Sequence, residues 1–325
     1  MWQRLPDTGG LKSMNKIEDA FKNKKAFIPF VTAGDPSLDV TRELILAMQE
    51  AGADLIEIGI PFSDPVAEGP VIQEADDRAL SAGVTTDKIF DMVDGIADKI
   101  HVPIVFMTYI NPIYVYGVEK FAKRAKACGA AGVIVPDVPF EEKEEIRGSF
   151  EAEGLVVISM VAPTSADRVR MIAKEAKGFL YCVSSLGVTG VRTEIGTAIG
   201  DLIQTVKEEC SIPCAIGFGI STPEQAEAMA KISDGAIVGS AIVKIVAKYG
   251  KNCVPYVIYS DDKGETWHLG GIMDVDYTNE STVTELSNGD LMLNMRKQSD
   301  TEKYRMVSTR HKANAFSLHA SPRIA

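Results

Sequence analysis

The stretch ADLIEIGIPFSDPVAEGPVIQ, residues 53–73, decides the fold. Its first half is a short apolar run with the alternation of a buried strand, and its isoleucines fall on one face. Glu57 falls on the other face, where a core residue would be expected. A second acid, Glu68, follows on the proline-rich segment after the strand. Because a buried carboxylate is costly unless it is protonated or lies at a cavity, the stretch predicts two acids that transfer protons.

Outward from this stretch, apolar runs alternate with segments of helical spacing. The runs cover 26–32, 55–60, 103–108, 132–135, 155–161, 179–184, 214–217 and 236–239. The helical segments cover 38–51, 86–99, 118–128, 141–153, 166–176, 197–209 and 223–231. Eight such steps favour an α/β fold in which a parallel sheet closes into a (β/α)8 TIM barrel. An open, doubly wound sheet is disfavoured because no dinucleotide-type glycine-rich turn follows the first run.

Length and composition limit the remaining possibilities. The 325 residues suffice for a barrel, which we place at 14–256, and an appendage at 257–325. Residues 1–13 show no periodicity and predict a disordered leader, whereas 14–25 predict a short amphipathic helix. The net charge of −11 argues against nucleic acid or an anionic membrane as partner, and no apolar run is long enough to span a bilayer. Five cysteines without zinc-like spacing to histidine indicate reduced thiols, a cytoplasmic location and no metal.

Glycines follow the last two predicted strands, at the end of the barrel where chemistry takes place. The seventh strand ends in Gly217-Phe-Gly219 and the eighth in Gly239-Ser240. Glycines let backbone N–H groups approach a phosphate, and a helix that starts near Ser240 adds its dipole. Either pair alone could be an ordinary tight turn, but the two together favour a phosphate site. A glycine-rich loop after the sixth strand, residues 184–190, is long enough to act as a mobile lid.

Six motifs resemble the α subunit of tryptophan synthase over residues 14 to about 257. They are FIPFVTAGDP (27–36), EIGIPFSDPVAEGPVIQ (57–73), PDVPFEE (136–142), SLGVTG (185–190), GFGIS (217–221) and GSAIVK (239–244). The resemblance implies a barrel lyase of tryptophan biosynthesis that cleaves indole-3-glycerol phosphate to indole and glyceraldehyde 3-phosphate in a retro-aldol reaction. It also implies a β-subunit partner in an α2β2 heterotetramer. This chain would carry no cofactor, and pyridoxal phosphate would belong to the β subunit.

The resemblance also assigns site residues. Glu57 would be the general acid and base, Glu68 would hold the indole N–H, and Tyr181 would be the third catalytic residue. Glu68 departs from the usual family pattern, which has Asp there. A structural carboxylate remains the alternative for Glu57, and simple core packing for Tyr181. A barrel that only docks on the β subunit without catalysis is the alternative for the whole chain.

The implied substrate pocket draws on most of the strand ends. Its residues are Phe30, Tyr109, Thr189, Gly190, Gly217, Gly219, Ile237, Gly239 and Ser240. Asp64 and Asp137 would organise loops and the face toward the β subunit, unless they are only turn caps.

The pattern changes near residue 257, where we infer that two coding sequences were joined. The segment SDDKGETW, 260–267, resembles the Asp-box of sialidase β-propellers, and Glu280 and Arg296 resemble two sialidase site residues. The segment is little more than one propeller blade, and a single blade cannot bury its own faces. We therefore expect a remnant without sialidase activity. The sequence predicts a two- or three-stranded meander over 256–296 and a disordered end after about residue 310.

Overall fold

The structure, a computed structural model, describes residues 17–183, 196–217, 219–220 and 222–250, together with six strands between residues 258 and 320. Contacts divide the chain into two units, Met1–Ala247 and Lys248–Ala325. The expected leader at 1–13 and the expected lid at 184–190 lie outside the described residues.

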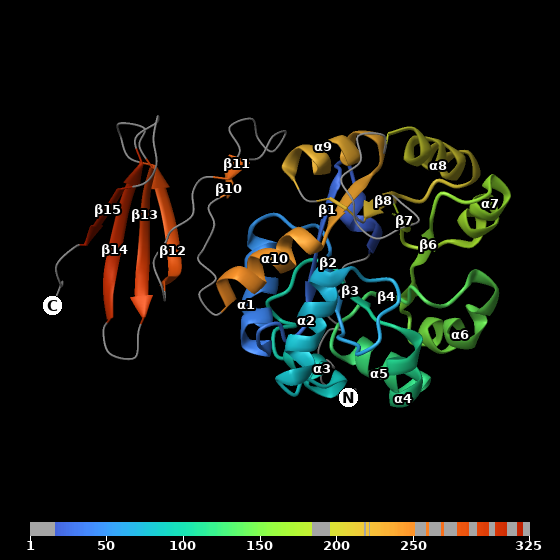
Figure 1. The fold of residues 1–325 in the computed structure, drawn as a ribbon, viewed down its shortest axis with the longest axis horizontal. Coiled ribbons are helices and arrows are strands. Elements are labelled where there is room, and N and C mark those ends of the chain that lie inside the picture. Colours follow the sequence, from blue (N-terminus) through green and yellow to red (C-terminus); the bar gives the residue numbers. More distant parts are fainter. Residues whose placement is uncertain are drawn as a thin grey trace, which may run out of the picture. The chain divides into compact units, whose positions relative to one another are not determined.

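The first unit is a closed parallel barrel (Figure 1). Its strands are β1 (Ala26–Thr32), β2 (Ile56–Gly59), β3 (Ile104–Met107), β4 (Gly132–Ile134), β5 (Val156–Val157), β6 (Ser159–Val161), β7 (Leu180–Val183), β8 (Cys214–Gly217) and β9 (Gly235–Val238). The strand order is β5-β4-β3-β2-β1-β9-β8-β7-β6. β5 and β6 are the two ends of this order, and only Ile158 separates them in the chain. They therefore form one interrupted strand that joins the two ends of the sheet, so the nine strands fill the eight positions of the barrel. The TIM-barrel prediction is confirmed.

Helices cover the outside of the barrel (Figure 1). They are α1 (Leu38–Glu50), α2 (Pro70–Ser81), α3 (Thr86–Asp94), α4 (Ile110–Tyr116), α5 (Val118–Ala127), α6 (Glu144–Ala152), α7 (Ala166–Glu175), α8 (Gly196–Glu209), α9 (Pro223–Ile232) and α10 (Ser240–Tyr249), with 3-10 turns η1 (Ile17–Phe21) and η2 (Phe140–Glu142). The described part of the helix expected at 14–25 is only the turn η1. The chain leaves it through Asn23, whose φ of 58° is a left-handed conformation that asparagine tolerates.

Two helices, α2 and α4, were not predicted. Pro70 reads as a break, but it stands at the first turn of α2, where a missing N–H costs nothing. The helix buries Ile72, Ala75 and Ala79 against the barrel. These residues are three and four positions apart, which is the spacing of one face of a helix. The β2–α2 connection is therefore confined to residues 60–69, the loop that carries Glu68.

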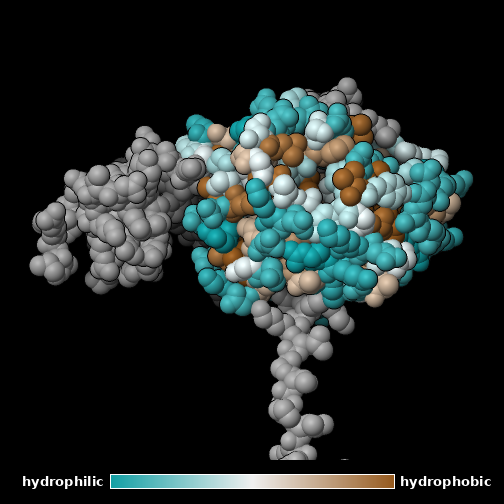
Figure 2. All heavy atoms as spheres, turned by 90° about the horizontal axis from the view of Figure 1, so that it is seen from below, coloured by the Kyte–Doolittle hydropathy of each residue, from teal (hydrophilic) through white to brown (hydrophobic). Residues whose placement is uncertain are grey.

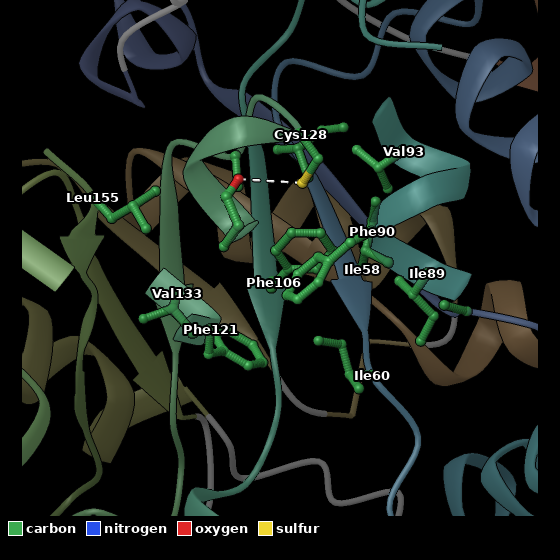
Figure 3. Close-up of a cluster of buried hydrophobic side chains, with 14 of the residues drawn as sticks. Ile58, Ile60, Ile89, Phe90, Val93, Phe106, Phe121, Cys128, Val133 and Leu155 are labelled. Atoms are coloured by element: carbon green, nitrogen blue, oxygen red, sulfur yellow. Dashed lines mark hydrogen bonds between the residues drawn. The ribbon is translucent and has the colours of Figure 1, made fainter. Parts of the chain in front are cut away.

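A layer of aromatic side chains between strands and helices fixes which face of each strand points inward (Figure 3). The ring of Phe90 on α3 packs edge-on against Phe106 of β3, at 5.2 Å between centroids, and Phe121 of α5, at 5.1 Å. Ile58 of β2 belongs to the same buried cluster. Because successive strand residues point to opposite faces, Ile58 in this outer layer places Glu57 inside the barrel.

The outer surface of the barrel is mixed in character. Hydrophilic residues predominate on the face drawn in Figure 2, and hydrophobic residues lie there in small separate groups. Within the described ranges, no helix has both the length and the apolar character needed to cross a membrane.

The second unit contains two antiparallel β-arrangements. Strand β10 (Ile258–Tyr259) pairs with β11 (His268–Leu269). Strands β12 (Thr278–Glu285), β13 (Leu291–Gln298), β14 (Lys303–Arg310) and β15 (Ser317–Ala320) form a four-stranded meander. The meander extends to β15, whose backbone pairs with that of β14 over Met306–Thr309. The Asp-box segment at 260–267 lies outside the described residues.

The aromatic layer predicts a large stability effect for one substitution. We expect Phe90→Ala to lower the free energy of unfolding by about 3–5 kcal/mol, because the fully buried ring leaves a cavity among rigid neighbours. Val115→Ala, at a side chain that is 83% exposed on α4, should change it by less than about 0.5 kcal/mol. Urea unfolding followed by circular dichroism measures both, and equal midpoints would contradict the packing described here.

Candidate active site

A cavity of about 50 Å³ lies at the C-terminal ends of the barrel strands. Its lining residues are Phe30, Glu57, Glu68, Ile72, Met107, Tyr181, Gly219, Ile220, Ile237, Gly239 and Ser240. Eight of these were predicted from the sequence; Ile72, Met107 and Ile220 were missed. Tyr109 and Gly217 contact lining residues without lining the cavity, and Thr189 and Gly190 lie outside the described residues.

Glu57 lies on β2 with its side chain fully buried. Among the described residues, neither of its carboxylate oxygens has a hydrogen-bond partner. Burial, and secondarily the charge of Glu68, raise the pKa of Glu57 well above its usual range. The raised pKa favours the protonated form of this carboxyl group, which lines the cavity and can there give a proton to a bound molecule.

Glu68 is held in place on the β2–α2 loop. The hydroxyl of Tyr109 donates to Glu68 Oε1 at 3.3 Å and accepts the backbone N–H of Ala67 at 2.9 Å. The side chain of Gln73 on α2 donates to the backbone carbonyl of Glu68 at 2.9 Å. Burial raises the pKa of Glu68, and the bond from Tyr109 opposes that shift. The result is a second carboxyl group fixed at the same cavity.

Tyr181 on β7 is 4% exposed, and its ring fits only because β8 ends in glycine. A Cβ atom at Gly217 would lie 2.3 Å from the Tyr181 hydroxyl oxygen. Burial, followed by the charges of Glu57 and Glu68, raises the pKa of Tyr181 well above its usual range. Gly217, which was predicted to bind phosphate, thus makes room for Tyr181. Gly59 plays the same part for Phe30, whose ring would be 2.5 Å from an added Cβ.

The proposed phosphate end of the cavity is formed by the loops after β8 and β9. Gly219 has a φ of +79°, a conformation that favours glycine. Gly239 and Ser240 line the cavity where α10 begins, so free backbone N–H groups and the helix dipole favour an anion there. The part of the chain that the structure describes holds no cluster of acidic, histidine or cysteine side chains suited to a metal.

The two loop aspartates differ in their surroundings. Both carboxylate oxygens of Asp137 accept the N–H of Ile110, at 3.0 and 3.3 Å, where α4 begins. Asp137 therefore ties the loop after β4 to the first residue of α4. Asp64 is exposed and accepts the hydroxyl of Ser63 at 2.5 Å.

Comparison with known proteins gives consistent matches over the barrel. The family model described as tryptophan synthase alpha chain matches residues 17–260. The tryptophan synthase alpha chain of Lacticaseibacillus casei is 49% identical over 235 residues, which cover 72% of this chain and 88% of the relative. That of Halalkalibacterium halodurans is 50% identical over 237 residues, covering 72% and 89%.

Solved structures agree with these sequence matches. The tryptophan synthase subunit alpha from Campylobacter jejuni superposes with a TM-score of 0.65 at 33% identity, over 70% of this chain and 91% of the other. A chain from the tryptophan synthase a2b2 complex of Pyrococcus furiosus superposes with a TM-score of 0.65 at 41% identity, over 70% and 92%.

The buried carboxyl group of Glu57 predicts that the stability of the protein depends on pH. Because its pKa is higher in the folded than in the unfolded chain, the folded state keeps a proton that the unfolded state loses, and stability falls as pH rises above about 4.3. We expect Glu57→Gln to melt at a higher temperature than the parent at pH 8, and at nearly the same temperature at pH 4. Glu43→Gln, at an exposed position on α1, serves as the control in calorimetry. A pH-independent gap for Glu57→Gln would contradict this account.

Proposed function

The chain belongs to the tryptophan synthase alpha chain family, and from this premise we propose that it is a lyase that cleaves indole-3-glycerol phosphate to indole and glyceraldehyde 3-phosphate. The observation that carries the proposal is the pair Glu57 and Glu68 at one cavity, with Glu57 fully buried and its pKa raised by that burial. A barrel that only docked on another subunit would gain nothing from a buried carboxyl group that has no hydrogen-bond partner among the described residues.

The chemistry we propose is a retro-aldol cleavage. Glu57 protonates C3 of the indole ring, which leaves a positive charge on the ring that the carboxylate of Glu68 stabilises through the N–H. Loss of the proton from the adjacent glycerol hydroxyl then forms the aldehyde, and the electrons of the broken carbon–carbon bond return to C3. The carboxylate of Glu57 takes up that proton, so the step is balanced and the acid is regenerated. Tyr181, buried beside both acids, packs against the reacting end.

Substrate binding follows from the two ends of the cavity. Phe30 and Ile237 offer apolar walls for the indole ring, with Tyr109 behind Glu68. Gly219, Gly239 and Ser240 would bind the phosphate. Thr189 and Gly190, on the proposed lid at 184–190, would close over it.

The family also suggests the assembly. The relative from Pyrococcus furiosus is part of an a2b2 complex, and we propose the same arrangement for this chain, with pyridoxal phosphate in the β subunit alone. Val66 and Val115, 82% and 83% exposed on the segments after β2 and β3, supply apolar surface for such a partner. We place the protein in the cytoplasm and assign no sialidase activity to residues 257–310.

We expect Glu57→Gln to lower indole release by at least about a hundredfold, because the amide keeps the volume but cannot exchange the proton. Binding of glycerol 3-phosphate should persist, since the phosphate end is unchanged. The assay measures indole released by the full chain with and without β subunit, with Glu43→Gln as the control. A loss of less than about tenfold would remove Glu57 from its proposed role.

For Glu68 we expect a graded series. Glu68→Asp should retain or raise activity, because the usual family residue keeps the charge, whereas Glu68→Ala should lose most of it. Steady-state kinetics of indole release measures the series. Equal activity in the parent, Glu68→Asp and Glu68→Ala would show that Glu68 takes no part in the reaction.

A further inference from the structure

Tyr109 was expected to wall the indole pocket, but its hydroxyl bonds to the loop between β2 and α2. The hydroxyl oxygen accepts the backbone N–H of Ala67 at 2.9 Å, and the hydroxyl donates to Glu68 Oε1 at 3.3 Å. The ring packs against that of Phe62, near the start of the loop, at 5.4 Å between centroids. Since Tyr109 is only 3% exposed, a buried side chain fixes both the backbone and the acidic group of this loop.

The partners of Tyr109 set the direction of its hydrogen bonds. A phenol has a single proton, and because its oxygen accepts from Ala67, that proton is available to Glu68. Burial first, and the charge of Glu68 next, raise the pKa of Tyr109 above its usual range, so the hydroxyl keeps the proton that it donates. Glu68 is therefore held as an acceptor, with its Oε1 atom engaged.

The backbone around Tyr109 is fixed to the barrel on both sides. Before it, the hydroxyl of Thr108 donates to the carbonyl oxygen of Ile60 at 3.4 Å. After it, the N–H of Ile110 donates to the two carboxylate oxygens of Asp137, at 3.0 and 3.3 Å. A residue on this rigid part of the barrel thus holds a side chain that belongs to a loop.

We propose that Tyr109 is a positioning residue that aims Glu68 at the substrate, holding one carboxylate oxygen so that the other is left for the indole N–H. This inference rests on the proposed function. Glu68 is one methylene longer than the aspartate usual in the family, so it has one more rotatable bond to fix. Without the hydroxyl, the carboxylate takes up further orientations. A displacement of about 1 Å at a reacting site costs up to about a hundredfold in rate.

A change of one atom tests this role. Tyr109→Phe removes the hydroxyl and keeps the ring that packs against Phe62. It should lower kcat/KM for indole release by the full chain by at least about tenfold. The loss should appear mainly in kcat, because the positive charge that Glu68 stabilises develops during the reaction. Tyr114→Phe, the same change at an exposed tyrosine on α4, is the control and should stay within about twofold of the parent.

A double-mutant cycle separates positioning from a merely structural role. In a Glu68→Ala chain, Tyr109→Phe should change kcat/KM by less than about threefold, because the group that the hydroxyl holds is already gone. A loss of the same size in the parent and in Glu68→Ala would overturn the proposal. A Tyr109→Phe chain as active as the parent would also overturn it.

A second measurement does not depend on activity. Amide hydrogen exchange at Ala67, corrected for intrinsic rates, should be at least about tenfold faster in Tyr109→Phe than in the parent, and unchanged in Tyr114→Phe. This result stands even if the chain releases no indole, so failure of the proposed function and failure of the Tyr109 tie are distinguishable. Exchange at Ala67 that is equally slow in Tyr109→Phe would show that the tie does not hold the loop.

Discussion

The site depends on one costly feature, the carboxyl group of Glu57 buried without a hydrogen-bond partner among the described residues. Burial favours the protonated form of this group, because burying the charged carboxylate would cost far more free energy than burying the neutral acid. A closed barrel can bear that cost, since neighbours on both sides fix β2: Glu57 lies in register with Phe30 of β1 and Val105 of β3. The scaffold is therefore rigid where the chemistry needs a proton donor.

The second acid depends on a different kind of support. Glu68 lies on a loop, so its position is set by side chains that reach the loop from elsewhere: Tyr109 after β3 and Gln73 on α2. Helix α2 is itself tied to the loop after β1 by the ion pair between Arg78 and Asp35. One acid is thus positioned by the sheet and the other by a helix and its bonds.

Much of this could be predicted from the sequence. The alternation at 55–60 placed Glu57 on a buried strand, and the repeat of apolar runs predicted the barrel. Helix α2 was not predicted because Pro70 resembles a chain break, and for that reason Ile72, which lines the cavity, was missed as well. The space that Gly217 leaves for Tyr181 depends on a contact between two strands, which periodicity does not reveal. The β15 pairing was missed for a similar reason, since strand partners are set by tertiary structure.

The most direct test of the account is the protonation state of Glu57 itself. Isotope-edited infrared difference spectroscopy of the parent against Glu57→Gln reports whether the carboxyl group is an acid or a carboxylate. The account predicts the carbonyl band of a protonated acid at pH 7, absent from Glu57→Gln. A carboxylate band from Glu57 already at pH 6 would contradict the account, because a group that is ionised there could not serve as the proton donor.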